Sequence, residues 1–140
     1  MAKIRLFSGL VFLLVLIVTG CTRTSESVPQ INQSGAKLTS ITLPEALANG
    51  KPTLAEFGRG TCIPCKEMKP ILEELAVDYQ GRLNVSIVSV DEYRSLTYHY
   101  GVMAIPTQIV FDSSGKEIFR HVGFWPKNQI FAQLMKFGID

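Results

Sequence analysis

Apolar residues recur with two different periods along this chain. Apolar side chains are nearly continuous over residues 53–57, which is typical of a strand covered on both faces. Residues 83–90 alternate and then end apolar, which predicts a second buried strand. Two further strands, 107–111 and 117–122, are separated by a turn in which Gly115 supplies the residue that tolerates positive φ. The pattern therefore predicts a sheet that ends in a hairpin.

Helical spacing marks the segments between and after these strands. Pro70 interrupts the longest such pattern and predicts a kink, since proline lacks an amide donor and crowds the preceding turn. Pro126 opens a last helix. Two short helices are also expected, one after a capping box that begins at Thr42 and one that Asp91 caps and that runs to about Tyr100. The two apolar stripes are Met68, Ile71, Leu72, Leu75 and Tyr79, and Ile130, Phe131, Leu134 and Phe137.

A short strand over 38–41 completes the expected order, β-α-β-α-β-α-β-β-α. Strands that alternate with helices and then form a hairpin imply an α/β fold, with a central mixed β-sheet and helices on both faces. With 140 residues and 46% apolar content, the chain is long enough for one domain with a real core. We place that domain at 38–140.

The first twenty residues are of a different kind. Lys3 and Arg5 precede an apolar run over 6–18, and small residues then lead to Cys21. This layout is typical of a secretory signal, and the run is short for a membrane span. The residues before Cys21 resemble a bacterial lipobox, which implies cleavage after residue 20 and lipidation of Cys21. An uncleaved anchor, or an ordinary signal with an incidental Cys21, are the alternatives.

Residues 22–37 are rich in Ser, Thr, Gln, Asn and Gly, and they predict a flexible tether. The expected organisation is therefore a signal peptide at 1–20, a tether at 21–37 and the folded domain. The formal charge of +2 comes from Lys3 and Arg5, so the rest of the chain is balanced. A near-neutral chain gives no electrostatic reason to expect nucleic acid as a partner.

Lipidation of Cys21 would leave Cys62 and Cys65 as a Cys-x-x-Cys pair where a strand gives way to a helix. Unpaired amide groups and the dipole at a helix start favour a thiolate at Cys62, by on the order of one pKa unit. Donation from the thiol or amide of Cys65 would add to this effect. Pro64 loses no hydrogen bond in the first turn and stiffens the loop. We expect an exposed, nucleophilic Cys62 and a more buried Cys65 that resolves a mixed disulfide.

A metal site is the main alternative for this pair. A closed zinc site needs four ligands, and the other candidates, His99 and His121, are far apart in sequence and on different elements. We therefore expect neither a metal nor a cofactor. A purely structural disulfide is disfavoured too, because so small a ring gains little from loop closure.

From residue 51 to residue 137 the chain resembles thioredoxin. The matching stretches are Lys-Pro-Thr-Leu-Ala-Glu-Phe at 51–57, Cys-Ile-Pro-Cys-Lys at 62–66, Pro-Ile-Leu-Glu-Glu-Leu-Ala at 70–76, Tyr-Gly-Val-Met-Ala-Ile-Pro-Thr at 100–107, and the hairpin residues at 115–117 and 122–123. They are similar to the family's central strand, active site, kinked helix, cis-proline loop and closing hairpin. The resemblance implies the thioredoxin fold and thiol–disulfide chemistry.

The resemblance also implies a substrate-binding surface. Pro106 would be cis and lie against the two cysteines, and the backbone of Ile105 would pair with an extended substrate segment. Thr61, Ile63 and Pro64 would border the same surface. An ordinary trans proline in a turn is the alternative for Pro106.

Glu56 stands at the place of the family's buried acid, six residues before Cys62. Desolvation would raise its pKa and suit it to carry the proton of Cys65. The alternative is a carboxylate at a strand end that reaches water. Where the family usually has aromatic residues, this chain has Gly58 and Thr61, and Ile87 replaces the lysine that commonly faces the acid.

These departures make ordinary thioredoxin reductase a poor partner and fit a thioredoxin-like protein outside the cytoplasm. We expect a lipid-anchored, monomeric oxidoreductase of the bacterial cell envelope, facing the periplasm or extracytoplasmic space, which reduces disulfides of exported proteins through Cys62 and Cys65. Pro64, rather than histidine, before Cys65 is commoner in reducing members. A reductant there needs electrons from across the membrane, which implies a DsbD- or CcdA-type transporter as donor and misoxidised proteins or apocytochrome c as acceptors.

Three other functions stay open at this point. The same fold could act as a disulfide oxidase or isomerase, which the redox potential of the pair would separate. A binding module could hold peptides at Ile105 and Pro106 without turnover. A metal-binding lipoprotein would bind zinc or copper in its reduced form.

Overall fold

The computed structural model describes residues 42–140. The expected strand at 38–41, the signal peptide, the tether and Cys21 lie outside these residues. The described elements are α1 (Leu43–Ala48), β1 (Thr53–Gly58), α2 (Ile63–Asp78), β2 (Asn84–Ser89), α3 (Arg94–His99), β3 (Thr107–Phe111), β4 (Glu117–Val122) and α4 (Lys127–Lys136).

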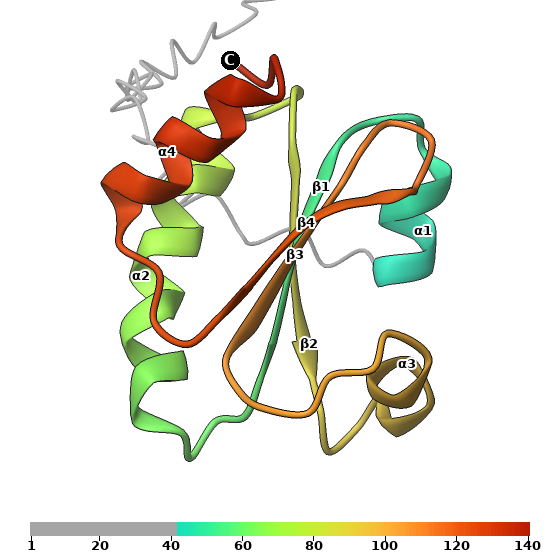
Figure 1. Ribbon diagram of the computed structural model, residues 1–140, viewed down its shortest axis with the longest axis vertical. Helices are drawn as coiled ribbons and strands as arrows, with labels where there is room; N and C mark the ends of the chain where they lie inside the picture. Colours follow the sequence, from blue (N-terminus) through green and yellow to red (C-terminus); the bar gives the residue numbers. More distant parts are fainter. Residues whose placement is uncertain (1–41) are drawn as a thin grey trace, which may run out of the picture. The chain divides into compact units, whose positions relative to one another are not determined.

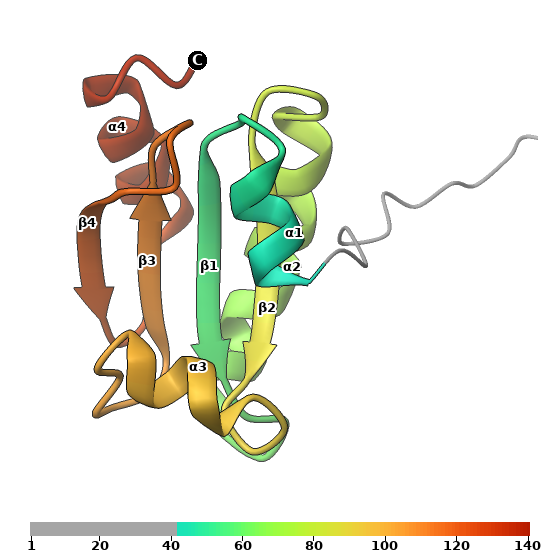
Figure 2. The ribbon, with the colours of Figure 1, turned by 90° about the vertical axis from the view of Figure 1, so that its right-hand side faces the viewer.

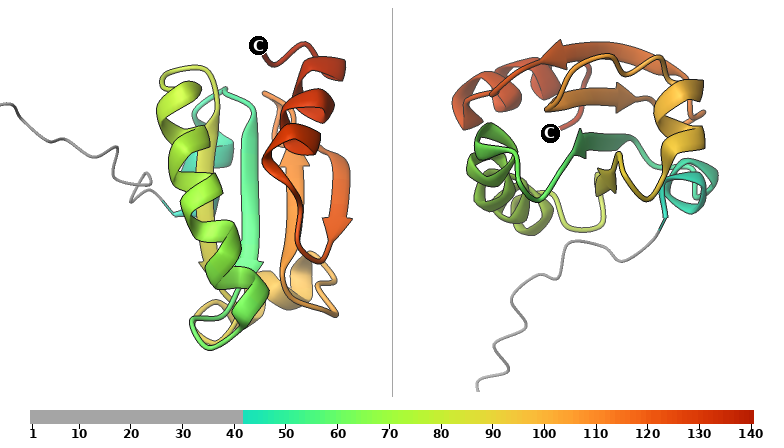
Figure 3. Two further views of the ribbon diagram at one scale, coloured as in Figure 1. Left: turned by 90° about the vertical axis from the view of Figure 1, so that its left-hand side faces the viewer. Right: turned by 90° about the horizontal axis from the view of Figure 1, so that it is seen from below.

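The four strands form one mixed sheet in the order β2-β1-β3-β4. β1 runs parallel to β2 and antiparallel to β3, and β3 and β4 form the antiparallel hairpin. Figure 2 looks onto the sheet, with α1 and α3 in front of it. Helices α2 and α4 cover the opposite face, as the edge-on view and the left-hand view show (Figures 1 and 3). The expected mixed sheet with helices on both faces is confirmed.

Alternation along β1 divides the core between the two faces. Leu54 joins the cluster under α2 and α4, whereas Ala55 and Phe57 join the cluster on the α1 and α3 side. Because neighbouring residues of a strand point to opposite faces, Glu56 lies on the same face as Leu54, beneath α2. Burial of each large apolar side chain stabilises the fold by about 1.5–3 kcal/mol. The sequence of β1 thus places one carboxylate inside an apolar layer.

The two long amphipathic stripes are confirmed. Met68, Leu72 and Leu75 of α2 are fully buried, and so are Ile130 and Leu134 of α4. The side chain of Glu45 accepts hydrogen bonds from the backbone N and Oγ1 of Thr42, at 2.8 and 3.0 Å, which confirms the capping interaction before α1.

Two local predictions are wrong. Asp91 does not cap α3, which begins after Tyr93, because both carboxylate oxygens of Asp91 are bound by the guanidinium of Arg59, at 2.8 Å each. Ile87 does not share the burial of the rest of β2 and is 40% exposed. It lies at the end of the strand where a small pocket opens beside Glu56.

One end of the sheet gathers the candidate chemistry. β1 and β2 end there, and antiparallel pairing places the start of β3 beside the end of β1, with Thr107 opposite Phe57. The N-terminus of α2 and helix α3 lie at this same end (Figure 2). No helix within residues 42–140 combines the length and the apolar character that a membrane crossing requires.

Candidate active site

Cys62 and Cys65 are joined by a disulfide at the start of α2. Cys62 is the N-cap residue, and its backbone is extended while the chain enters the helix at Ile63. The amide N of Cys65 points at the sulfur of Cys62, at 3.4 Å, and this is one of the donors expected from the sequence. A helix N-terminus and an amide donor both favour negative charge on that sulfur.

The two sulfurs differ in access. Cys62 is half-buried, whereas Cys65 is 7% exposed and borders the small pocket that Glu56 also lines. Thr61 and Ile63 on either side of Cys62 are exposed, and Pro64 is half-buried in the first turn. An incoming disulfide can therefore reach Cys62 more easily than Cys65.

The Ile105–Pro106 peptide bond is cis. Pro106 is buried and Ile105 is half-buried, directly before β3. The carbonyl oxygen of Pro106 accepts a hydrogen bond from the amide of Gly123, at 2.8 Å, which ties this loop to the end of β4. The loop lies at the same end of the sheet as the cysteines.

Glu56 is the buried acid of the site. Its side chain is 2% exposed, and its Oε1 has no hydrogen-bond partner among the described residues. Burial in this apolar surrounding raises the pKa of Glu56 to about 7. A carboxyl group that titrates near neutrality can both accept and release a proton under physiological conditions.

A small pocket of about 140 Å³ connects Glu56 with Cys65. Gly58, the last residue of β1, explains how the two groups come close. A Cβ atom at Gly58 would lie 2.7 Å from Oε1 of Glu56 and 3.2 Å from the sulfur of Cys65. The carboxyl oxygen and the sulfur thus flank one methyl-sized space, which stays free because residue 58 has no side chain.

Three cationic residues border the same pocket, namely Arg59, Lys66 and Lys69. Arg59 pairs with Asp91, and the ammonium of Lys69 lies 3.7 Å from Glu73. Ile87, which faces Glu56 across β1 and β2 in register, contributes no charge. None of the ion pairs found within residues 42–140 includes the carboxyl group of Glu56.

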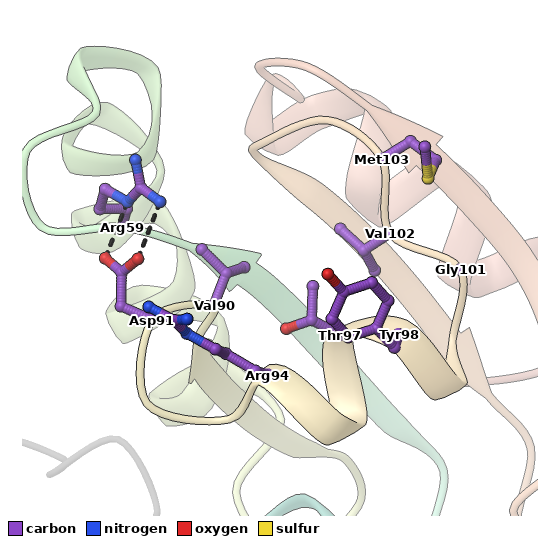
Figure 4. Close-up of a pocket in the computed structure, with 9 residues that line it drawn as sticks. All are labelled: Arg59, Val90, Asp91, Arg94, Thr97, Tyr98, Gly101, Val102 and Met103. Carbon is purple, nitrogen blue, oxygen red and sulfur yellow. Dashed lines mark hydrogen bonds and ion pairs between the residues drawn. The ribbon is translucent and has the colours of Figure 1, made fainter.

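A second pocket, of about 450 Å³, borders the site on the α3 side. Figure 4 shows Arg59 and Asp91 joined on one flank, Thr97 and Tyr98 of α3 below, and Met103 on the segment that leads to the cis-proline. Met103 is 95% exposed and Tyr98 is 85% exposed. Sequence reasoning missed this pocket, since only the fold brings the end of β1 next to residues 90–103.

Within the described part of the chain, no three His, Cys, Asp or Glu side chains are grouped so that they could hold a metal ion. His121 instead stacks on Trp125, with ring centroids 5.0 Å apart. His99 packs edge-on against Tyr100.

The fold and the site together define a dithiol redox protein. A Cys-x-x-Cys pair lies at a helix N-terminus, a buried acid borders the same pocket as Cys65, and a cis-proline lies at the same end of the sheet. The sequence model of the thioredoxin family matches residues 35–136. The chain therefore belongs to the thioredoxin family. The expected family and fold are confirmed, and membership together with the cysteine pair makes the protein a thiol–disulfide oxidoreductase.

Individual relatives agree with this assignment. The chain is 37% identical over 97 residues to a thioredoxin of Alicyclobacillus acidocaldarius, covering 69% of this chain and 91% of the relative. It is 43% identical over 83 residues to a thioredoxin of Staphylococcus aureus, covering 59% and 79% of the two chains. The solved structure of a mutant thioredoxin from Halobacterium salinarum is similar, with a TM-score of 0.62 and 28% identity over 70% of this chain and 83% of that one.

Proposed function

We propose that this protein is a membrane-tethered reductase of disulfides in exported proteins. The observation that carries the chemistry is the Cys62–Cys65 disulfide at the start of α2, with the Cys65 amide directed at the sulfur of Cys62. In the reduced form, the same amide and the helix N-terminus stabilise a thiolate at Cys62.

Reduction proceeds in two exchanges. The Cys62 thiolate attacks one sulfur of the substrate disulfide, the substrate S–S bond breaks, and one substrate sulfur leaves as a thiolate that takes up a proton. Cys65, once deprotonated, then attacks Cys62 in the mixed disulfide. The second substrate sulfur leaves and is protonated, and the Cys62–Cys65 disulfide seen here is the product. Two electrons and two protons pass to the substrate.

Glu56 is the group that removes the proton from Cys65. Both residues line the pocket of about 140 Å³, and the methyl-sized space at Gly58 lies between the carboxyl oxygen and the sulfur. With its pKa raised to about 7, a substantial fraction of Glu56 is ionised near neutral pH and able to accept that proton.

Substrate proteins bind on the surface around Cys62. Thr61 and Ile63 are exposed beside the cysteine, Pro64 shapes the first turn, and the Ile105–Pro106 segment offers backbone for an extended substrate chain. Met103, just before this segment, adds an exposed flexible apolar contact. Such a surface accepts apolar segments of partly unfolded proteins.

The compartment and the direction rest on sequence features. The lipobox-like residues before Cys21 support a lipid anchor in the bacterial cell envelope, with residues 22–37 as tether and signal removal after residue 20. The Ile63–Pro64 pair between the cysteines supports a reducing role. A DsbD- or CcdA-type membrane transporter is the corresponding electron donor.

A glutathione equilibrium tests the direction. A pair with a potential near the thioredoxin value of about −270 mV stays more than about 99% oxidised in a buffer held at about −200 mV, since about 30 mV corresponds to a tenfold change. Alkylation of free thiols followed by mass spectrometry measures the reduced fraction. A pair that is largely reduced in this buffer would identify an oxidase instead.

Cell fractionation tests the tether. The full-length wild type should sediment with membranes and incorporate a labelled fatty acid. Cys21→Ala should incorporate none and should keep its signal peptide, so that it migrates as the longer, uncleaved chain. Cys62→Ser serves as the matched control, because it also removes one thiol but leaves the lipobox intact. An unlabelled wild-type protein would count against lipidation, whatever its redox activity.

A further inference from the structure

Gln108 is buried among the apolar residues of β3. It is 0% exposed, and neither its Oε1 nor its Nε2 has a hydrogen-bond partner among the residues described. A buried amide without partners destabilises a fold, so its presence in a central strand needs a reason. The other buried side-chain atom in this part of the chain that has no partner is Oε1 of Glu56.

The strand register places these two side chains next to each other. Glu56 of β1 and Gln108 of β3 are directly opposite in the antiparallel pair. Opposite residues point to the same face with Cβ atoms roughly 4.5–5.5 Å apart, a separation that two long side chains easily bridge. Gln108 also shares this face with Val110, which packs in the cluster under α2 and α4.

The other residues around Glu56 give Oε1 of its carboxyl group no hydrogen bond in the described part of the chain. From β2, Ile87 and Ser89 border the pocket; from the β1–α2 connection comes Arg59, which is bound to Asp91. From α2 come Cys65, Lys66 and Lys69.

On its far side, Gln108 faces His121 of β4. That imidazole stacks on Trp125, and its Nε2 lies 3.2 Å from the carbonyl oxygen of Phe124. Across the sheet, Gln108 therefore lies between Glu56 of β1 and His121 of β4. Of these two neighbours, Glu56 is the one with a side-chain oxygen that has no hydrogen-bond partner.

We propose that Gln108 is a positioning residue for Glu56. The two side chains are not hydrogen-bonded to each other in this structure, and rotation of the Gln108 side chain brings its amide to the carboxyl group of Glu56 in either protonation state. An amide suits this role because its NH₂ donates to a carboxylate and its carbonyl oxygen accepts from a protonated carboxyl. When Cys65 passes its proton to Glu56, rotation of the Gln108 amide exchanges one contact for the other. The inference deepens the proposed function, since it rests on Glu56 as the proton acceptor.

The titration of Glu56 in the oxidised protein tests the pairing without turnover. The side-chain carboxyl carbon of Glu56 is followed by NMR in the ¹³C-glutamate-labelled full chain, and its signal is assigned with Glu56→Gln. Gln108→Met, which keeps the length of the side chain but removes the amide, should raise the midpoint by roughly 0.7 pH unit. Both protonation states lose a hydrogen bond, but the bond to the carboxylate is the stronger by about 1 kcal/mol, so the charged form loses more. Gln108→Leu should move it in the same direction.

Ile109→Val is the matched control, because Ile109 is buried in the same strand but points to the opposite face. It should leave the midpoint unchanged, and His121 signals are recorded separately so that its protonation is not mistaken for that of Glu56. Midpoints that stay at the wild-type value in both Gln108 variants would overturn the pairing. A raised midpoint combined with unaltered turnover of Glu56→Gln would support the pairing and overturn only the proton role of Glu56.

Discussion

Cys62→Ser should lose at least about a thousandfold in the rate of insulin disulfide reduction, because a serine hydroxyl is not ionised near neutral pH and cannot replace the attacking thiolate. Cys62 is half-buried and so more accessible to an incoming disulfide than Cys65, which is 7% exposed. The turbidity of reduced insulin, with a chemical dithiol as electron source, measures this rate. Thr61→Ser, at the exposed neighbour, should stay close to wild type.

Cys65→Ser should behave differently, although it also stops turnover. Cys62 can still attack, but no second thiol resolves the product, so a mixed disulfide with the substrate accumulates. Non-reducing electrophoresis detects this adduct, which a reductant releases. If the adduct formed with Cys62→Ser and not with Cys65→Ser, the assigned roles of the two cysteines would be reversed.

The parts of this structure that were predictable from sequence are those with local signals. The buried strand at β1 follows from a continuous apolar run, and α2 follows from apolar residues at helical spacing. The cysteine pair lies at their junction, so its place at a helix N-terminus follows from the same two patterns.

Contacts between distant segments could not be predicted in this way. Aspartate is a common N-cap residue, so Asp91 is a reasonable candidate for a helix cap. In the structure Arg59, 32 residues earlier, binds both of its carboxylate oxygens, and α3 begins later, after Tyr93. Ile87 fits the alternation of a buried strand, yet the end of that strand borders a pocket. The pairing of Asp91 and the exposure of Ile87 both depend on which residues of other elements lie next to them in the fold. The periodicity of apolar residues along the chain does not contain this information.

The surroundings of Glu56 show the same limit. Its position in a buried strand is readable from the sequence, and so is the missing lysine at Ile87. The space that Gly58 leaves beside the carboxyl group is known only from the three-dimensional structure, in which a Cβ at this position would come too close to Glu56. The position of Gln108 opposite Glu56 is known only from the register between β1 and β3. Register between strands is set by the whole core.

Glu56→Gln should make the oxidised protein more stable at pH 8 while it slows reduction of insulin by about tenfold or more, because the amide needs no ionisation in the core but cannot accept a proton. The pH dependence has a definite sign. The carboxyl pKa is raised from 4.5 to about 7 on folding, so between these values the unfolded chain loses its proton while the folded chain keeps it. The free energy of unfolding therefore falls with rising pH, by about 1.4 kcal/mol per unit and about 3 kcal/mol in total.

Urea unfolding of the wild type and Glu56→Gln at pH 5 and pH 8 measures this difference, with the fluorescence of Trp125, the one tryptophan of the chain, as the signal. The advantage of Glu56→Gln over wild type should grow by about 2.5 kcal/mol between the two pH values, since a part of the total already appears below pH 5. Glu67→Gln, at an exposed position of α2, should change stability by less than about 0.5 kcal/mol at either pH. Parallel pH curves for wild type and Glu56→Gln would mean that Glu56 ionises normally. The buried carboxylate would then lack the near-neutral titration that proton exchange with Cys65 requires.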